Sequence, residues 1–214
     1  MYIPKQFEET NTSVLHALVR SNPLGTWVSE NGGSLVVNHI PFILDEARGP
    51  LGTLVGHVAR ANDVWKLVSS GAESVVVFQG AQAYITPSWY PTKHEHGKVV
   101  PTWNYAVVHA HGRPKAIDDR EWLLNHVAKL TGLHESQREM PWQVSDAPTE
   151  FIAALLDAIV GIEIPIARLA GKWKASQNRT SPDKLGVIAG LRNIDSDDAN
   201  DMAALIEARD RSEG

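Results

Sequence analysis

The chain contains no cysteine, and this absence removes several classes of chemistry at once. Disulfide bonds, thiolate metal sites and a cysteine nucleophile are excluded, so only oxygen and nitrogen chemistry or a bound cofactor remains. No apolar run reaches the length that spans a bilayer, and the N-terminus lacks the basic and then apolar order of a secretory signal. We therefore expect a cytoplasmic protein without membrane contact.

Sequence fingerprints of common functions are also missing. There is no glycine-rich dinucleotide motif, no phosphate-binding lysine loop and no recognisable helix-turn-helix. Ser88 follows a proline, but it lacks the G-x-S-x-G framing of a hydrolase nucleophile. The net charge of −5 opposes nucleic acid at long range, although a local basic patch can override it.

What is present is a globular composition, with 43% hydrophobic and 21% charged residues in 214. This length buries a substantial core and favours one domain with a helical supplement, or two small domains. We predict one domain over residues 1–191, followed by an acidic tail over residues 192–214 that is partly helical or frayed.

Periodicity along the chain predicts a mainly β fold with α additions. Strand-like patterns occupy residues 24–29, 34–44, 52–58, 73–79, 84–86, 102–111 and 160–169, and Asn31-Gly32-Gly33 predicts a hairpin between the first two. Amphipathic helical patterns occupy residues 12–20, about 118–135 and about 147–159. Two further short helices are predicted, one after residues 59–63 and one from Ser181.

The stretch 84–112 is the richest in aromatic, histidine and hydroxyl residues. Its middle contains Pro87, Pro91, Gly97 and Pro101, which predict an ordered loop rather than a helix or a central strand. The rings and lysines of this loop suit an aromatic ligand that carries an anionic group. The alternative is a large loop packed on its own domain or across a dimer.

Polar residues in three other segments are candidates for the same ligand. Asn38 and His39 lie on opposite sides of an otherwise apolar strand, so each needs a partner inside the protein or on a ligand. Arg60 and Asn62 stand where a strand passes into a helix, a place that suits a phosphate, although Asn62 also suits a helix cap. The run 171–179 places a tryptophan among cations and amides, and its alternative is a strand end that runs into solvent.

Two histidine pairs have spacings compatible with zinc, copper or iron. His94 and His96 form one pair, and His109 and His111 form the other. Apart from Glu95, no carboxylate lies at a diagnostic distance in the sequence. We therefore expect no metal site.

Six runs carry a resemblance to a known family. They are Pro23-Leu-Gly-Thr, Asn38-His-Ile-Pro-Phe, Gly56-His-Val-Ala-Arg-Ala-Asn62, Tyr84-Ile-Thr-Pro-Ser-Trp-Tyr, His96-Gly-Lys-Val-Val-Pro-Thr-Trp-Asn-Tyr105 and Gly171-Lys-Trp-Lys-Ala-Ser-Gln-Asn178. Together they resemble the PaiB family, which is described as FMN-binding negative transcriptional regulators. The resemblance runs from Met1 to about Leu191, and Asp63 departs from it where proline is expected.

The resemblance implies a split β-barrel like that of pyridoxamine-phosphate oxidases, forming a homodimer with FMN at the subunit interface. It also implies repression of protease and sporulation genes, so DNA is a partner by resemblance although no DNA-reading element is present. We accordingly expect a flavin-binding regulator rather than an enzyme. The alternatives are an FMN-dependent oxidoreductase that uses NADH or NADPH, and a haem-binding barrel with His39 or His109 as ligand.

On this hypothesis the cofactor-binding residues have distinct roles. Arg60 and Lys98 hold the phosphate, while Ser88 and Thr102 supply hydroxyl groups. The alternative position for the phosphate, if Arg60 does not hold it, is around Lys172 and Lys174. Hydrogen bonds to the flavin or its ribityl chain come from amides and a histidine, and three rings form walls. The full predicted set is Asn38, His39, Arg60, Asn62, Ser88, Trp89, Tyr90, Lys98, Thr102, Trp103, Asn104, Lys174, Ser176, Gln177 and Asn178.

Overall fold

The structure is a computed structural model that describes residues 1–68 and 71–212. Its strands are β1 (Glu8–Glu9), β2 (Leu24–Asn31), β3 (Ser34–Pro41), β4 (Ile43–Asp45), β5 (Thr53–Ala59), β6 (Ser74–Ile85), β7 (Thr102–Gly112), β8 (Lys115–Ile117) and β9 (Ile159–Lys174). Hydrogen bonds connect them in the order β3-β2-β6-β7-β9-β5-β4, with β1 and β8 also pairing with β9.

Helices occupy most of the intervening segments. The α-helices are α1 (Thr12–Ser21), α2 (Val64–Leu67), α3 (Thr92–His96), α4 (Arg120–Glu135), α5 (Thr149–Asp157), α6 (Ser181–Arg192) and α7 (Asp197–Ser212), and short 3-10 turns lie at Lys5–Phe7, Pro87–Trp89 and Val144–Asp146. The predicted mixture of a large sheet with helical additions is confirmed. In the described part of the chain, no helix combines the length and the apolarity needed to cross a membrane.

The chain divides into two compact units that alternate along the sequence. Unit 1 comprises Met1–Leu18, Gln79–Val108 and the chain from Ala170 onward, and unit 2 comprises Val19–Phe78 and His109–Leu169. Strands β6, β7 and β9 therefore contribute residues to both units. This division does not coincide with the predicted boundary at residue 191.

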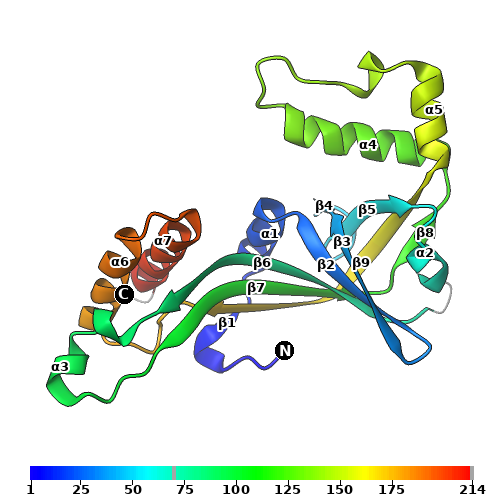
Figure 1. Ribbon diagram of the computed structural model, residues 1–214. Helices are drawn as coiled ribbons and strands as arrows, with labels where there is room; N and C mark the ends of the chain where they lie inside the picture. The colour runs from blue at the N-terminus through cyan, green and yellow to red at the C-terminus, as the bar shows by residue number, and fades with distance from the viewer. Residues whose placement is uncertain (69–70, 213–214) are drawn as a thin grey trace. The chain divides into compact units, whose positions relative to one another are not determined.

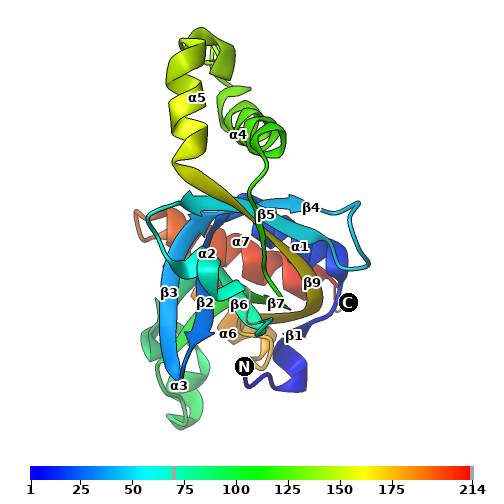
Figure 2. The same cartoon turned by 90° about the vertical axis from the view of Figure 1, so that its right-hand side faces the viewer.

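Unit 2 contains the β2–β3 hairpin and the helices α4 and α5 (Figure 2). The hairpin turns at Gly32 and Gly33, whose φ angles of 56° and 88° are readily reached only by glycine. Helix α4 begins where Asp119 accepts a hydrogen bond from the Trp122 amide at 2.7 Å. Both features follow the local sequence signals.

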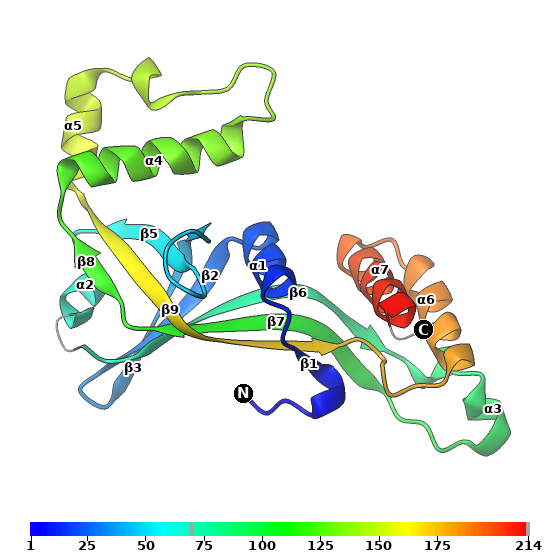
Figure 3. The same ribbon diagram turned by 180° about the vertical axis from the view of Figure 1, so that it is seen from behind.

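Unit 1 has its own hydrophobic core, formed where α6 and α7 lie side by side (Figures 1 and 3). Met202, Ala203 and Ile206 of α7 are at most 1% exposed and pack with residues of α6. The segment that we predicted as partly helical or frayed is thus a packed helix through Ser212, because its apolar residues repeat at helical spacing. Residues 213 and 214 of that segment lie outside the described residues.

The stretch between β6 and β7 corrects one prediction. We expected a loop without helix, but the 3-10 turn Pro87–Trp89 and helix α3 lie within it. Pro91 occupies the N-cap of α3, where its missing N–H is no handicap, and Gly97 ends the helix with φ of 67°. Two of the residues that were interpreted as helix breakers, Pro91 and Gly97, instead delimit the helix.

Candidate cofactor-binding site

A lysine at the end of β9 organises one group of predicted site residues in unit 1. The Lys174 ammonium donates to the hydroxyl of Thr102 and, at 2.6 Å, to the carbonyl oxygen of Trp103. Burial lowers the pKa of Lys174, and the positive charges of Lys172 and Arg179 lower it further. The structure thus brings three of the predicted site residues, Lys174, Thr102 and Trp103, together.

Lys172 lies two residues earlier in the same strand and is only 9% exposed. Its ammonium lies 5.2 Å from the centre of the Tyr105 ring and donates to the carbonyl oxygen of Tyr2 at 3.2 Å. Within the described residues, no carboxylate comes within ion-pair distance of Lys172, Lys174 or Arg179. Three neighbouring cations are therefore left without a negative partner.

Two aromatic rings of the same unit are open to solvent. Tyr84 on β6 and Trp103 on β7 are each 50% exposed, and their ring centres lie 6.1 Å apart in an edge-on arrangement. The indole N–H of Trp103 donates to the side-chain oxygen of Gln82 at 3.3 Å, which fixes the orientation of the ring. Exposed rings of this kind offer a surface on which a flat heterocycle can stack.

The predicted amides of unit 1 are mostly used inside the protein. Asn104 and Ser176 are buried and hydrogen-bonded to each other at 2.9 Å. Gln177 accepts from the Ala175 amide at 2.7 Å and donates to the Trp173 carbonyl at 2.5 Å. These groups shape the turn after β9, while Asn178 is exposed.

The aromatic pair at positions 89 and 90 is less accessible than the prediction assumed. Tyr90 is 1% exposed and belongs to the core with α6 and α7, and the Arg179 guanidinium lies 4.5 Å from its ring centre. Trp89 is half-buried, whereas Ser88 and Lys98 are exposed. A side chain as enclosed as Tyr90 has no ring face to offer a ligand, so Trp103 is the most exposed of the three predicted rings.

The other predicted residues, Asn38, His39, Arg60 and Asn62, lie in unit 2. Asn62 donates to the side-chain oxygen of Asn38 at 2.7 Å and accepts from the Val64 amide at the start of α2. These two amides satisfy each other in part, which is the structural alternative to ligand binding. His39 is exposed on β3.

Arg60, which we predicted to contact the phosphate, is hydrogen-bonded within the protein. Its guanidinium binds both carboxylate oxygens of Asp118, at 2.6 and 3.0 Å, and also donates to the carbonyl oxygens of Asp157 and Ile159. These contacts use four of its five N–H groups. Arg60 therefore connects the segments that flank the α4–α5 pair. Since carboxylate and carbonyl oxygens occupy most of its N–H groups, it has little capacity left to bind a phosphate.

Two features of the sequence would have improved the prediction. Lys172 lies on the same strand face as Lys174, because residues two positions apart in a strand point the same way. Tyr84 lies near the end of a strand, and its ring contacts that of Trp103, which was in the predicted set. Lys172 entered the prediction only as part of the alternative phosphate site, and Tyr84 was not in the predicted set. Tyr105, which lies under the Lys172 ammonium, was also omitted.

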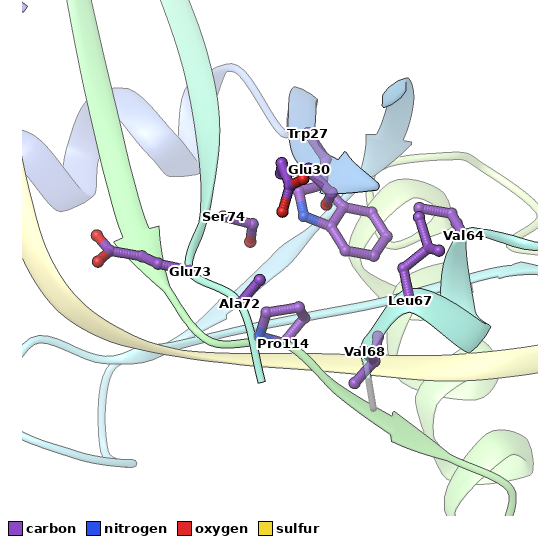
Figure 4. A pocket seen from close by; sticks show the side chains of 10 residues that line it. Trp27, Glu30, Val64, Leu67, Val68, Ala72, Glu73, Ser74 and Pro114 are labelled. Atoms are coloured by element: carbon purple, nitrogen blue, oxygen red, sulfur yellow. The ribbon is translucent and has the colours of Figure 1, made fainter. Parts of the chain in front are cut away.

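A separate pocket in unit 2 is too small to hold a cofactor (Figure 4). Trp27, Val64 and Pro114 are among the side chains that line it, and its volume of about 10 Å³ admits no more than one water molecule. None of the predicted site residues lines this pocket. Among residues 1–68 and 71–212, no three histidine or acidic side chains are placed to hold a metal ion.

Comparison with known proteins assigns both a family and a fold. A family model described as "Putative FMN-binding domain" matches residues 1–168. A Bacillus subtilis protein named protease synthase and sporulation protein PAI 2 is 31% identical over 97% of each chain, and an uncharacterized Emericella nidulans protein is 35% identical over 98% of this chain and 97% of its own.

Two solved structures share the fold at low sequence identity. The FAD and heme binding protein of Mycobacterium smegmatis has a TM-score of 0.60 and 16% identity, covering 86% of this chain and 80% of its own. The flavocytochrome Anf3 of Azotobacter vinelandii has a TM-score of 0.57 and 13% identity, covering 85% and 74%. This chain therefore shares its fold with two proteins whose names describe flavin binding, and the predicted mainly β fold with α additions is confirmed.

Proposed function

Since this chain belongs to the PaiB-type family of FMN-binding domains, we propose that it binds FMN and holds the phosphate against Lys174 and Lys172. Thr102 supplies a hydroxyl group beside the ammonium of Lys174, and Trp103 with Tyr84 supplies the stacking surface for the flavin. Lys98, Ser88 and Asn178 remain exposed candidates for further polar contacts.

The observation that carries this proposal is the uncompensated charge around Lys174. The chain has a net charge of −5, yet Lys174 contacts only uncharged oxygens and has two other cations nearby. Burial and the charges of Lys172 and Arg179 both lower the pKa of Lys174, so its positive charge is unfavourable without an anionic partner. A bound phosphate removes the repulsion and completes the hydrogen bonds, so it stabilises the cluster.

A fluorescence titration with FMN and with riboflavin tests the proposal. Riboflavin has the same ring system without the phosphate, so Lys174→Gln should weaken FMN binding by roughly 10- to 100-fold and leave riboflavin binding unchanged. Lys66→Gln, which removes an exposed lysine of unit 2, is the matched control. A parent protein that is colourless and shows no saturable FMN quenching would eliminate FMN binding, and equal losses for both flavins would move the phosphate away from Lys174.

We further propose that the protein is a cytoplasmic regulator rather than an enzyme. The support is the name of the Bacillus subtilis relative, protease synthase and sporulation protein PAI 2. An FMN-dependent oxidoreductase is the alternative, and it predicts steady-state oxidation of NADH or NADPH that requires FMN. Haem binding through His39 or His109 predicts a Soret band instead.

We also propose the homodimer, with FMN at the subunit interface, that the family resemblance implies. Its support is an apolar sheet face of unit 2, where Leu24, Leu35 and Val37 are 60%, 73% and 53% exposed. Leu35 and Val37 alternate along the edge strand β3, and Val37 lies opposite Val28 of β2. A second copy that covers this face would bury these side chains and protect the edge strand.

A further inference from the structure

Helix α6 contains two glycines four residues apart, Gly186 and Gly190, so both lie on one helical face. Glycine is a poor helix former, and two of them in one helix call for a physical reason. That reason is Trp89. A Cβ atom at Gly186 would overlap the carbonyl oxygen of Trp89, and one at Gly190 would overlap its indole ring. The glycines let the backbone and ring of Trp89 rest directly on the helix.

A buried carboxylate on the same helix provides a second attachment. Asp183 is 3% exposed and accepts hydrogen bonds from the Thr92 amide at 3.2 Å and from the Thr92 hydroxyl at 2.8 and 3.0 Å. No lysine or arginine of the described residues forms an ion pair with it. Its negative charge is therefore stabilised by the loop that it holds and by the N-terminal end of α6.

Helix α6 is itself rigidly supported within unit 1. Val187 and Leu191 are fully buried and share a core cluster with Tyr90 of the loop and with Met202 and Ile206 of α7. Arg209 of α7 also pairs with the buried Glu9. The surface that receives Trp89 is thus part of a packed core rather than an isolated helix.

The loop over residues 86–101 is consequently held from the C-terminal part of the chain at both ends. Trp89 and Thr92 contact α6 at one end, and Thr102, directly after the loop, binds Lys174 at the other. Helices α6 and α7 lie beyond residues 1–168, which the family model matches. They therefore lie outside the part of the chain that the family model covers.

We infer that Gly186, Gly190 and Asp183 are positioning residues for FMN binding: through Trp89 and Thr92 they hold the loop that carries Ser88 and Lys98 in the conformation that the cofactor needs. This inference rests on the proposed function. A loop that is ordered before the ligand arrives lowers the conformational cost of binding, so loosening it reduces affinity without removing a ligand contact.

Alanine substitutions of matched glycines test this inference. Gly190→Ala introduces a methyl group into the Trp89 ring, whereas Gly132→Ala introduces one into open space within helix α4. Both changes improve intrinsic helix propensity, so the collision with Trp89 is the difference between them. Asp183→Asn is the second variant, and it tests the inference even if Gly190→Ala does not fold. It keeps the side-chain shape and weakens the hydrogen bonds to Thr92.

Two measurements are made on the full chain below its unfolding transition. Trypsin cleavage at Lys93 and Lys98 reports the order of the loop, and titration with FMN reports affinity. We expect Gly190→Ala and Asp183→Asn to accelerate cleavage at these lysines and to weaken FMN binding by about tenfold, while Gly132→Ala changes neither. Unchanged cleavage or unchanged affinity in the folded variants overturns the inference. If the parent protein does not bind FMN, both the proposed function and this inference fail. If the parent binds FMN and the variants bind it equally tightly, only this inference fails.

Discussion

The Nδ1 atom of His57 lies 3.0 Å from the Nε2 atom of His126, so a single proton joins two imidazole rings between β5 and α4. The His126 ring stacks on Trp122 with ring centres 5.3 Å apart, and the Trp122 indole donates to Glu163 at 3.0 Å. Burial lowers the pKa of both histidines, and the charges of His57 and Lys129 lower the pKa of His126 further, to about 4. Unit 2 therefore holds this pair in the uncharged form.

This pair makes stability fall as the pH falls. The pKa of His126 is about 4 in the folded protein against 6.5 in the unfolded chain, so the unfolded chain takes up the proton first. The stability contributed by keeping His126 neutral is complete above pH 6.5 and is lost between pH 6.5 and 4, by about 3 kcal/mol in total. Urea denaturation of the parent and of His126→Leu at pH 7, 5.5 and 4.5 gives the free energy of unfolding at each pH. The slope of this free energy against pH should be smaller for His126→Leu than for the parent.

The control for the pH experiment is His134→Gln, which removes an exposed histidine from the same helix. It should retain the pH dependence of the parent, whereas His126→Leu should flatten it. The carboxyl groups of Glu163 and Asp118 have lowered pKa values and affect stability at a more acidic pH. Equal slopes for the parent and His126→Leu would mean that His126 is not held neutral.

Arg60→Ala should lower stability rather than FMN affinity. The substitution removes the ion pair with Asp118 and leaves the carbonyl oxygens of Asp157 and Ile159 without their donor. The urea midpoint should fall, and Arg60→Lys should restore little of it, because an ammonium cannot reproduce the two-point contact. Arg113→Ala, which removes an exposed arginine, is the control. If Arg60→Ala lowers the FMN affinity while its urea midpoint is unchanged, and Arg113→Ala has no such effect, Arg60 contacts the phosphate after all.

Val37→Lys should dissociate the proposed homodimer without unfolding the protein. Val37 is 53% exposed on β3, so a lysine fits the single chain, but it places an unpaired charge in each half of a symmetric interface. We expect dimerisation to weaken by roughly a hundredfold or more, as measured by light scattering after size-exclusion chromatography. Leu185→Lys, at a 66% exposed position of α6, should stay dimeric. A dimeric Val37→Lys variant, or a monomeric parent, contradicts the prediction.

Met202→Ala should destabilise the protein substantially, because α7 is packed rather than frayed. Met202 is 0% exposed within the core that it shares with α6, and a buried methionine replaced by alanine costs about 2–5 kcal/mol. Leu185→Ala, at an exposed position, should change stability by less than about 0.5 kcal/mol. Chemical denaturation followed by tryptophan fluorescence measures both, and equal midpoints would indicate that α7 does not contribute to the core.

Local signals account for the parts of the fold that were predicted correctly. Asp119 before an amphipathic pattern marked the start of α4, and Gly32-Gly33 between two alternating runs marked the hairpin. Each depends on residues within a few positions of one another, so the sequence contains all the information required. The interpretation of Pro91 failed because proline is permitted at a helix start, which the surrounding loop residues do not reveal.

The site depended on contacts that are distant in sequence. Arg60 and its partners are separated by 58 to 99 residues in the sequence. Local sequence around Arg60 therefore gives no sign that Asp118, Asp157 and Ile159 accept its hydrogen bonds. Likewise, the role of Gly190 became visible only when Trp89, a residue of another segment, was found on its surface. Sequence pattern identifies a residue's chemistry but not the neighbours that already use it.

The amino-acid order alone determined the alternating strands, the capped helices and the family membership, because periodicity, turn chemistry and motif similarity are properties of adjacent residues. The tertiary structure decided which cations lack a counter-charge, which rings are open to a ligand and which helix supports the loop. Those properties are set by burial and by hydrogen bonds between remote segments. Lys174 illustrates the difference, since it is one of 20 lysines and arginines in the sequence but, with Lys172 and Arg179, forms a cluster without a carboxylate among the described residues of the folded chain.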